Sequence, residues 1–163
     1  MTTFSSSTTA EALVPVGRDR VWDVLTDPDV VARLTPFVSS ITEEGDHWIW
    51  TMSGLSVLGK GFTATFTERM TLEERTRIEF THDPPAGGKE RAGVHGWYAL
   101  SDHTGADGAR SDECVMLEIS LEICVDLPLP RLSGGAVRST MKAVTSQMGD
   151  RFSKNLLDHL GVG

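Results

Sequence analysis

Apolar side chains near the end of the chain recur at steps of three and four residues, at Val137, Met141, Val144, Met148, Phe152, Leu156 and Leu160. This spacing places them on one face of a helix. Ser133 precedes the pattern as a candidate N-cap, and Gly161 follows it as a candidate C-cap. A helix over 133–160 would be about 40 Å long. It therefore needs a broad apolar surface to cover.

The residues before this helix alternate between apolar and polar, as strands do. In the clearest segment, 113–127, six apolar side chains face one way: Val115, Leu117, Ile119, Leu121, Ile123 and Val125. Other strands are predicted over 5–16, 38–43, 47–53, 62–72, 76–82 and 91–101. Two short helices, around 21–25 and 30–34, separate the first two strands and end before Pro28 and Pro36. With no repeat, linker or second core, residues 1–163 are expected to form one domain.

The composition narrows the classes of function. A net charge of −8 and a pI near 5.0 argue against nucleic acid as a partner, because phosphate binding needs clustered Lys and Arg. No apolar run approaches the roughly 20 residues that cross a bilayer. The segment Met1–Thr9 lacks the basic and apolar parts of a secretory signal. A cytoplasmic protein is the expectation.

Cysteine and histidine spacing predicts neither a disulfide nor a metal site. Cys114 and Cys124 fall on one predicted strand, about 33 Å apart, whereas a disulfide tolerates a Cα separation of only about 7 Å. His95, His103 and His159 have no partners at metal-ligand spacing. We therefore expect two structural thiols, no metal and no cofactor.

The first forty residues carry a resemblance to a known family. Val14-Pro15-Val16, the run 21–25, Asp27-Pro28, Leu34, Pro36 and Ile41 resemble the opening of START-like proteins. These form the helix-grip superfamily of polyketide cyclase/dehydrase-like and lipid-transfer proteins. The resemblance implies an α+β fold, in which a curved seven-stranded antiparallel sheet wraps around the long C-terminal helix. It also implies a hydrophobic ligand between the sheet and the helix.

Glu68 is the polar residue on an otherwise apolar face of its strand, with Phe66 and Met70 beside it. The next strand offers Phe80 and His82 on its apolar face. A connection of three residues, 73–75, would set Glu68 opposite Phe80 and Phe66 opposite His82. Glu68 and His82 would then lie diagonally, about 7 Å apart along the backbone. They are candidates either for a structural pair, or for ligand contact and acid–base chemistry.

The predicted ligand-binding residues come from three strands and the long helix. Apolar and aromatic side chains at a period of two are typical of a plain core, but in this fold the core is also the cavity lining. Methionines on the helix would adapt to ligand shape. The set is Trp50, Met52, Phe62, Phe66, Glu68, Met70, Phe80, His82, Met141, Val144 and Met148.

The segment from Gly54 to Lys60 matches the spacing of a phosphate-binding loop, G-x-x-x-x-G-K. Gly61 stands where that motif needs Ser or Thr, and a predicted strand follows where it needs a helix. Nucleotide binding is therefore rejected. A glycine-hinged flap with exposed Leu55, Val57 and Leu58 at the cavity mouth is expected instead, and the same segment could serve as a homodimer contact.

Two functional hypotheses remain. The first is a binder or carrier of a small hydrophobic molecule such as a lipid, polyketide or isoprenoid-like compound. The second is a cofactor-independent aromatase/cyclase that moves protons with Glu68 and His82. Cyclases of this superfamily place more polar groups along the pocket, whereas this chain has one tyrosine, Tyr98, and no arginine that clearly points inward. That difference favours the binder.

Overall fold

The computed structural model describes residues 2–57, 60–104 and 110–162, with the backbone alone over 54–57, 60–62, 103–104 and 110–113. Its element order is one strand, two short helices, six strands and a long helix, as predicted. The strands form one antiparallel sheet in the order β1-β7-β6-β5-β4-β3-β2. Their bounds are β1 Thr2–Val14, β2 Val38–Glu44, β3 His47–Val57, β4 Lys60–Glu73, β5 Arg77–His82, β6 Ala92–Thr104 and β7 Arg110–Leu127.

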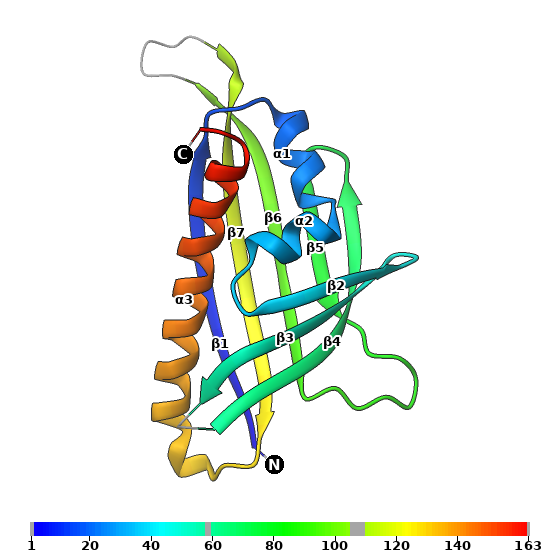
Figure 1. Ribbon diagram of the computed structural model, residues 1–163, viewed down its shortest axis with the longest axis vertical. Helices are drawn as coiled ribbons and strands as arrows, with labels where there is room; N and C mark the ends of the chain where they lie inside the picture. Colours follow the sequence, from blue (N-terminus) through cyan, green and yellow to red (C-terminus); the bar gives the residue numbers. More distant parts are fainter. Residues whose placement is uncertain (1, 58–59, 105–109, 163) are drawn as a thin grey trace.

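The helices cover one face of this curved sheet (Figure 1). α1 spans Arg18–Leu25 and α2 spans Pro28–Leu34, where the Asp27 carboxylate accepts hydrogen bonds from the backbone N–H groups of the first turn. α3 spans Gly134–His159 and lies along β1 and β7. Its predicted apolar face is buried, apart from a partly buried Val144. The helix-grip architecture is thereby confirmed.

The ends of α3 differ from each other in how well they were predicted. Ser133 is the N-cap, but its side chain makes no capping hydrogen bond because a 3₁₀ turn, Arg131–Ser133, leads directly into the helix. At the other end Gly161 has a φ of 77°, the left-handed conformation expected of a glycine after a helix. None of the helices in the described residues is both long and apolar enough to cross a membrane.

The described parts of the glycine-rich segment, 53–57 and 60–61, are not the loop that the sequence suggested. Their backbone continues β3 and β4, and the pairs Leu55–Phe62 and Val57–Lys60 extend the pairing of these strands beyond an irregularity after Met52. In these residues strand pairing overrides the conformational freedom of the glycines, and Gly61 continues into β4 where a phosphate-binding loop needs a helix. The predicted exposure of Leu55, Val57 and Leu58 lies outside the described side chains.

The predicted register of β4 and β5 was wrong by two residues. Glu68 pairs with His82 directly, rather than with Phe80. The strands stay paired as far as Glu73 and Arg77, and the connection is therefore residues 74–76 instead of 73–75. A shift of two leaves every side chain on its predicted face.

Two glycines let large side chains lie across β6. A Cβ atom at Gly96 would collide with the backbone oxygen of Ser120 and would approach the Phe80 ring to 2.8 Å. A Cβ atom at Gly93 would meet the imidazole ring of His82. β6 is thus shaped to receive the side chains of β5.

Candidate functional site

Two adjoining chambers lie between the sheet and α3, and five residues belong to the walls of both: Met52, Phe66, Val94, Ile123 and Met148. One has a volume of about 60 Å³ and the other about 70 Å³. A single water molecule needs roughly 10–15 Å³ on such a scale. Each chamber therefore has room for a few water molecules, and the space between the sheet and α3 is not packed solid.

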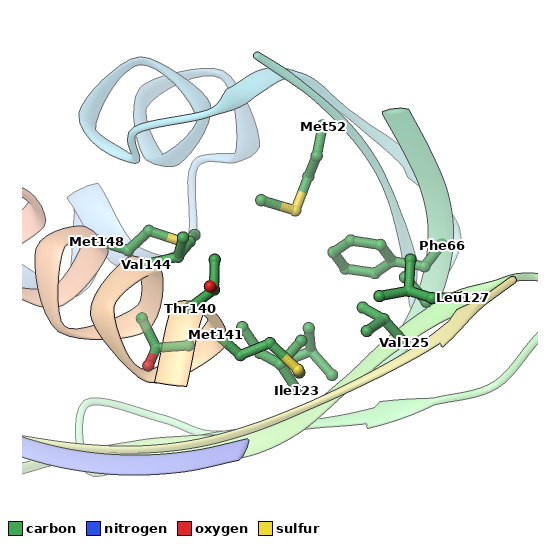
Figure 2. A pocket seen from close by; sticks show the side chains of 12 residues that line it. Met52, Phe66, Ile123, Val125, Leu127, Thr140, Met141, Val144 and Met148 are labelled. Carbon is green, nitrogen blue, oxygen red and sulfur yellow. The ribbon is translucent and has the colours of Figure 1, made fainter. Parts of the chain in front are cut away.

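The first space, called here the apolar chamber, lies beside the first half of α3 (Figure 2). Met141, Val144 and Met148 of the helix face Met52, Phe66 and the inner side chains of β7 across it. Its two threonines direct their hydroxyl groups back to the helix: Thr140 donates to the backbone oxygen of Ala136 at 3.1 Å, and Thr145 to that of Lys142 at 3.0 Å. The wall therefore offers a ligand almost entirely hydrocarbon and thioether surface.

The second space, called here the Glu68 chamber, lies farther along α3. Its wall contains Glu68, Trp50 and Tyr98, and Glu68 is only 1% exposed to solvent. Both carboxylate oxygens of Glu68 and the indole nitrogen of Trp50 are buried without a hydrogen-bond partner. Within the described residues, no other buried side-chain nitrogen or oxygen is left without a partner. The unpaired polar groups of the interior are thus gathered in one chamber.

The environment of Glu68 disfavours its ionised form. Burial, followed by the negative charge of Glu90, raises the pKa of Glu68 well above its ordinary value. Burial, followed by the charge of Glu68, raises the pKa of Tyr98 as well. Both groups are therefore held toward their neutral forms, in which each has a proton to donate.

Aromatic rings fix the positions of these polar groups. The Trp50 ring stacks on Phe66 with centroids 6.0 Å apart, and Tyr98 stacks on Phe152 of α3 at 6.2 Å. Phe80 lies against Tyr98 at 5.3 Å. Such contacts hold rings in one orientation. The chamber is accordingly a shaped space rather than an adaptable gap.

His82 belongs to a different group of side chains, at the end of β5. Its Nε2 atom lies 2.9 Å from Oε1 of Glu90. Glu90 also accepts hydrogen bonds from the backbone N–H and the hydroxyl group of Thr67, both at 2.8 Å. The Glu90 carboxylate thereby takes the place of a strand neighbour where β5 ends. His82 pairs with Glu68 along the backbone, but its imidazole bonds Glu90.

The predicted site residues separate into three groups. Eight line the chambers: Trp50, Met52, Phe66, Glu68, Phe80, Met141, Val144 and Met148. Met70 is buried in the core and His82 bonds Glu90, and neither is in the wall of a chamber. The side chain of Phe62 lies outside the described residues.

Sequence reasoning missed Tyr98 and Val94 of β6, as well as Gly149 and Phe152 of α3. In β6 both faces carry apolar residues, so alternation alone does not choose the inner one. The register of β6 on β7 identifies the inner face of β6, because Tyr98 pairs with Ile119, an inward-facing residue of β7. Within the described residues, no three His, Cys, Asp or Glu side chains lie close enough together to hold a metal ion.

Comparison with solved structures shows the same fold in several proteins of low sequence identity. The protein TTHA0849 from Thermus thermophilus has a TM-score of 0.68 at 16% identity, over 94% of this chain and 95% of that one. The Zhui aromatase/cyclase from a Streptomyces species has a TM-score of 0.65 at 15% identity, over 95% and 93%. A START superfamily protein from Mycobacterium smegmatis has a TM-score of 0.60 at 12% identity, over 94% and 97%.

Sequence comparison gives the family. No curated protein matches the chain at a significant level. The family model described as "Polyketide cyclase / dehydrase and lipid transport" matches residues 14–152. The resemblance that the first forty residues carry is thereby confirmed over most of the sequence. This chain belongs to the polyketide cyclase/dehydrase and lipid transport family, and it has the START-like fold.

Proposed function

We propose that this protein binds a small, mostly apolar molecule in the two chambers, with a hydroxyl or carbonyl group of that molecule held at Glu68. The observation that carries the proposal is the Glu68 carboxyl group, which is buried, unpartnered and part of a chamber wall. A buried polar group without a partner costs roughly 1–3 kcal/mol. A ligand that supplies the missing hydrogen bonds recovers that free energy on binding.

The polar groups of the Glu68 chamber define the chemistry of the ligand. A neutral carboxyl group donates one hydrogen bond and accepts others, and an indole N–H only donates. A hydroxyl group satisfies Glu68 in either direction, and a carbonyl oxygen accepts from Glu68 or from Trp50. A carboxylate ligand at Glu68 would instead bring a second negative charge near that of Glu90. We therefore expect a neutral ligand, such as a polyketide, isoprenoid or lipid fragment.

The apolar chamber accounts for the rest of the ligand. It adjoins the Glu68 chamber through a shared wall, and three methionines border the two spaces: Met52, Met141 and Met148. Thioether side chains adapt to differently shaped partners at small cost. We propose that a hydrocarbon portion lies here while the polar end is fixed at Glu68.

Displacement of the neutral fluorescent dye phenylnaphthylamine tests this proposal. In the wild type we expect octanol to displace the dye about tenfold better than octane, which corresponds to about 1.4 kcal/mol. Glu68→Leu should remove this preference, whereas Glu74→Gln, in an exposed turn, should keep it. Equal displacement by both molecules in the wild type would contradict an anchor at Glu68. Native mass spectrometry of protein from its own host would then identify the resident ligand by mass.

A cyclase or dehydratase reaction is the second candidate, and one observation favours it. Glu68 and Tyr98, two groups that can exchange protons, share the wall of one chamber. In this version Tyr98, rather than His82, would act with Glu68. Incubation with a linear poly-β-ketone mimic should then give a cyclised product with the wild type and far less with Glu68→Gln or Tyr98→Phe. Unchanged mimic after incubation with the wild type would reject the enzyme and leave the binder.

A further inference from the structure

The inner face of β1 is covered unevenly along its length. Phe4 and Val14 are buried at 3% and 0% exposure, and between them the inward positions carry only short side chains: Ser6, Thr8, Ala10 and Ala12. Of these inward residues, Ala10 alone is exposed. β1 is also an edge strand, and α3 packs across it (Figure 1). The seam between β1 and α3 is therefore closed at its two ends and thinly covered near Ala10.

α3 presents a glycine at the same level. β1 and α3 begin at the same end of the molecule and run side by side (Figure 1). Ala10 lies about 26 Å along β1 from its start, and Gly149 lies about 22 Å along α3 from its start. A Cβ atom at Gly149 would meet nothing within 4 Å. Each side of the seam thus lacks a covering side chain at this level.

The thin part of the seam leads into the Glu68 chamber. Gly149 belongs to the wall of that chamber, together with Ile119 and Leu121 of β7. These two residues are the strand partners of Ala10 and Thr8. The other flank of α3 is joined to α2 by a hydrogen bond. Asn155 lies about a third of a turn around the helix from Gly149, and it donates to the backbone oxygen of Leu34 at 3.0 Å. Entry from the side of β1 would leave this hydrogen bond intact.

We propose that the ligand enters and leaves the Glu68 chamber through the β1–α3 seam at Ala10 and Gly149. This inference rests on the proposed function, since a portal requires a ligand. A glycine in the middle of a helix is less favourable than an alanine there. At Gly149 the missing side chain leaves open space at the wall of the chamber that holds Glu68. A narrow or flat molecule fits such an opening better than a branched one.

Stopped-flow measurements with phenylnaphthylamine test the portal in the intact protein. Gly149→Leu and Ala10→Leu each place a side chain in the seam from opposite sides. We expect each to slow association and dissociation of the dye about tenfold while Kd changes less than threefold. Gly149→Ala controls for the helix backbone, and Gly135→Leu is the matched control. Gly135 also lies in α3, its Cβ would also meet nothing within 4 Å, and it lines neither chamber.

The possible outcomes separate the portal from the binding site. Slow exchange in either seam variant at nearly constant Kd supports the portal. Rates equal to those of Gly135→Leu in both variants overturn the portal and leave the binding proposal intact. Faster dissociation with weaker Kd also overturns it, because the new side chain would then occupy the chamber instead of the seam. A wild type that does not bind the dye overturns the proposed function, and the portal with it.

Discussion

The Glu68 chamber and the end of β5 each hold a buried or nearly buried glutamate, and the two carboxylates are surrounded in opposite ways. Glu90 is 13% exposed and accepts hydrogen bonds from two groups of Thr67, with His82 as a third partner. Glu68 is 1% exposed and has no partner. A satisfied carboxylate stabilises the fold, whereas an unsatisfied one stores free energy that a ligand can release. The first is therefore structural, and the second marks the candidate site.

The largest expected effect on stability comes from replacing Glu90, the carboxylate whose hydrogen bonds are satisfied. Glu90→Ala leaves the Thr67 N–H, the Thr67 hydroxyl and His82 without their common partner. We expect the free energy of unfolding to fall by about 2–3 kcal/mol, because the orphaned groups lose their hydrogen bonds. Urea denaturation at neutral pH measures it. Glu79→Ala, on the exposed face of β5, is the control, and equal losses in both variants would contradict the role of Glu90.

The pH dependence of stability comes next. The pKa of Glu68 is raised in the folded state above its ordinary value of 4.5. The folded protein therefore keeps this proton over a pH range in which the unfolded chain has released it. The contribution of Glu68 to the free energy of unfolding is fully present below about pH 4.5. It is lost as the pH rises toward the folded-state pKa, and the free energy of unfolding falls by up to about 1.4 kcal/mol per pH unit. Denaturation series should show this loss in the wild type and not in Glu68→Gln.

Replacing the unsatisfied carboxylate should have the opposite sign to replacing the satisfied one. Glu68→Leu removes a buried group that lacks hydrogen bonds and supplies an apolar side chain that is shorter but branched. We expect the protein without ligand to become more stable by about 1–2 kcal/mol at neutral pH. The thermal midpoint measured beside that of Glu90→Ala checks it. A destabilised Glu68→Leu would show that Glu68 has a structural role after all.

The smallest expected effect on stability comes from removing one of the hydrogen bonds that Glu90 accepts. Thr67→Val keeps the shape of the side chain and the backbone N–H but removes one of the three donors. We expect a loss of about 1 kcal/mol, less than for Glu90→Ala, because the other two hydrogen bonds remain. A double-mutant cycle between Thr67→Val and Glu90→Ala measures the pair directly. Fully additive losses would mean that this hydrogen bond contributes nothing.

The sequence predicted the architecture because the period of apolar positions is a local property. The step pattern of α3 and the strict alternation of β7 need no tertiary information. The β4–β5 register needed more, since residues 73–76 allow two pairings that bury the same faces. The strand ends 54–57 and 60–61 were misjudged because glycines permit a loop without requiring one, and pairing between β3 and β4 decided the outcome.

The candidate site was predictable only in part. Glu68 could be singled out because a charged residue interrupts an apolar face. Tyr98 could not, because β6 is apolar on both faces and only its pairing with β7 selects the inner one. The bond between His82 and Glu90 joins a strand end to a residue eight positions further on in an irregular connection. No periodicity in the sequence encodes such a contact. Glu68 and His82 were predicted to be neighbours because they share a face of the sheet, but the Glu68 side chain lines a chamber and the His82 imidazole bonds Glu90.

The two glycines of β6 set different limits on how this protein can change. At position 96 an added side chain would collide with the backbone oxygen of Ser120, so a larger residue there would force β6 and β7 apart. At position 93 the atoms nearest to an added Cβ belong to the His82 ring, which can rotate away if it gives up its hydrogen bond with Glu90. Substitution at 93 is therefore open to a variant that rebuilds the end of β5, while substitution at 96 requires a new sheet geometry. Side chains larger than glycine should therefore arise at position 93 before they arise at position 96.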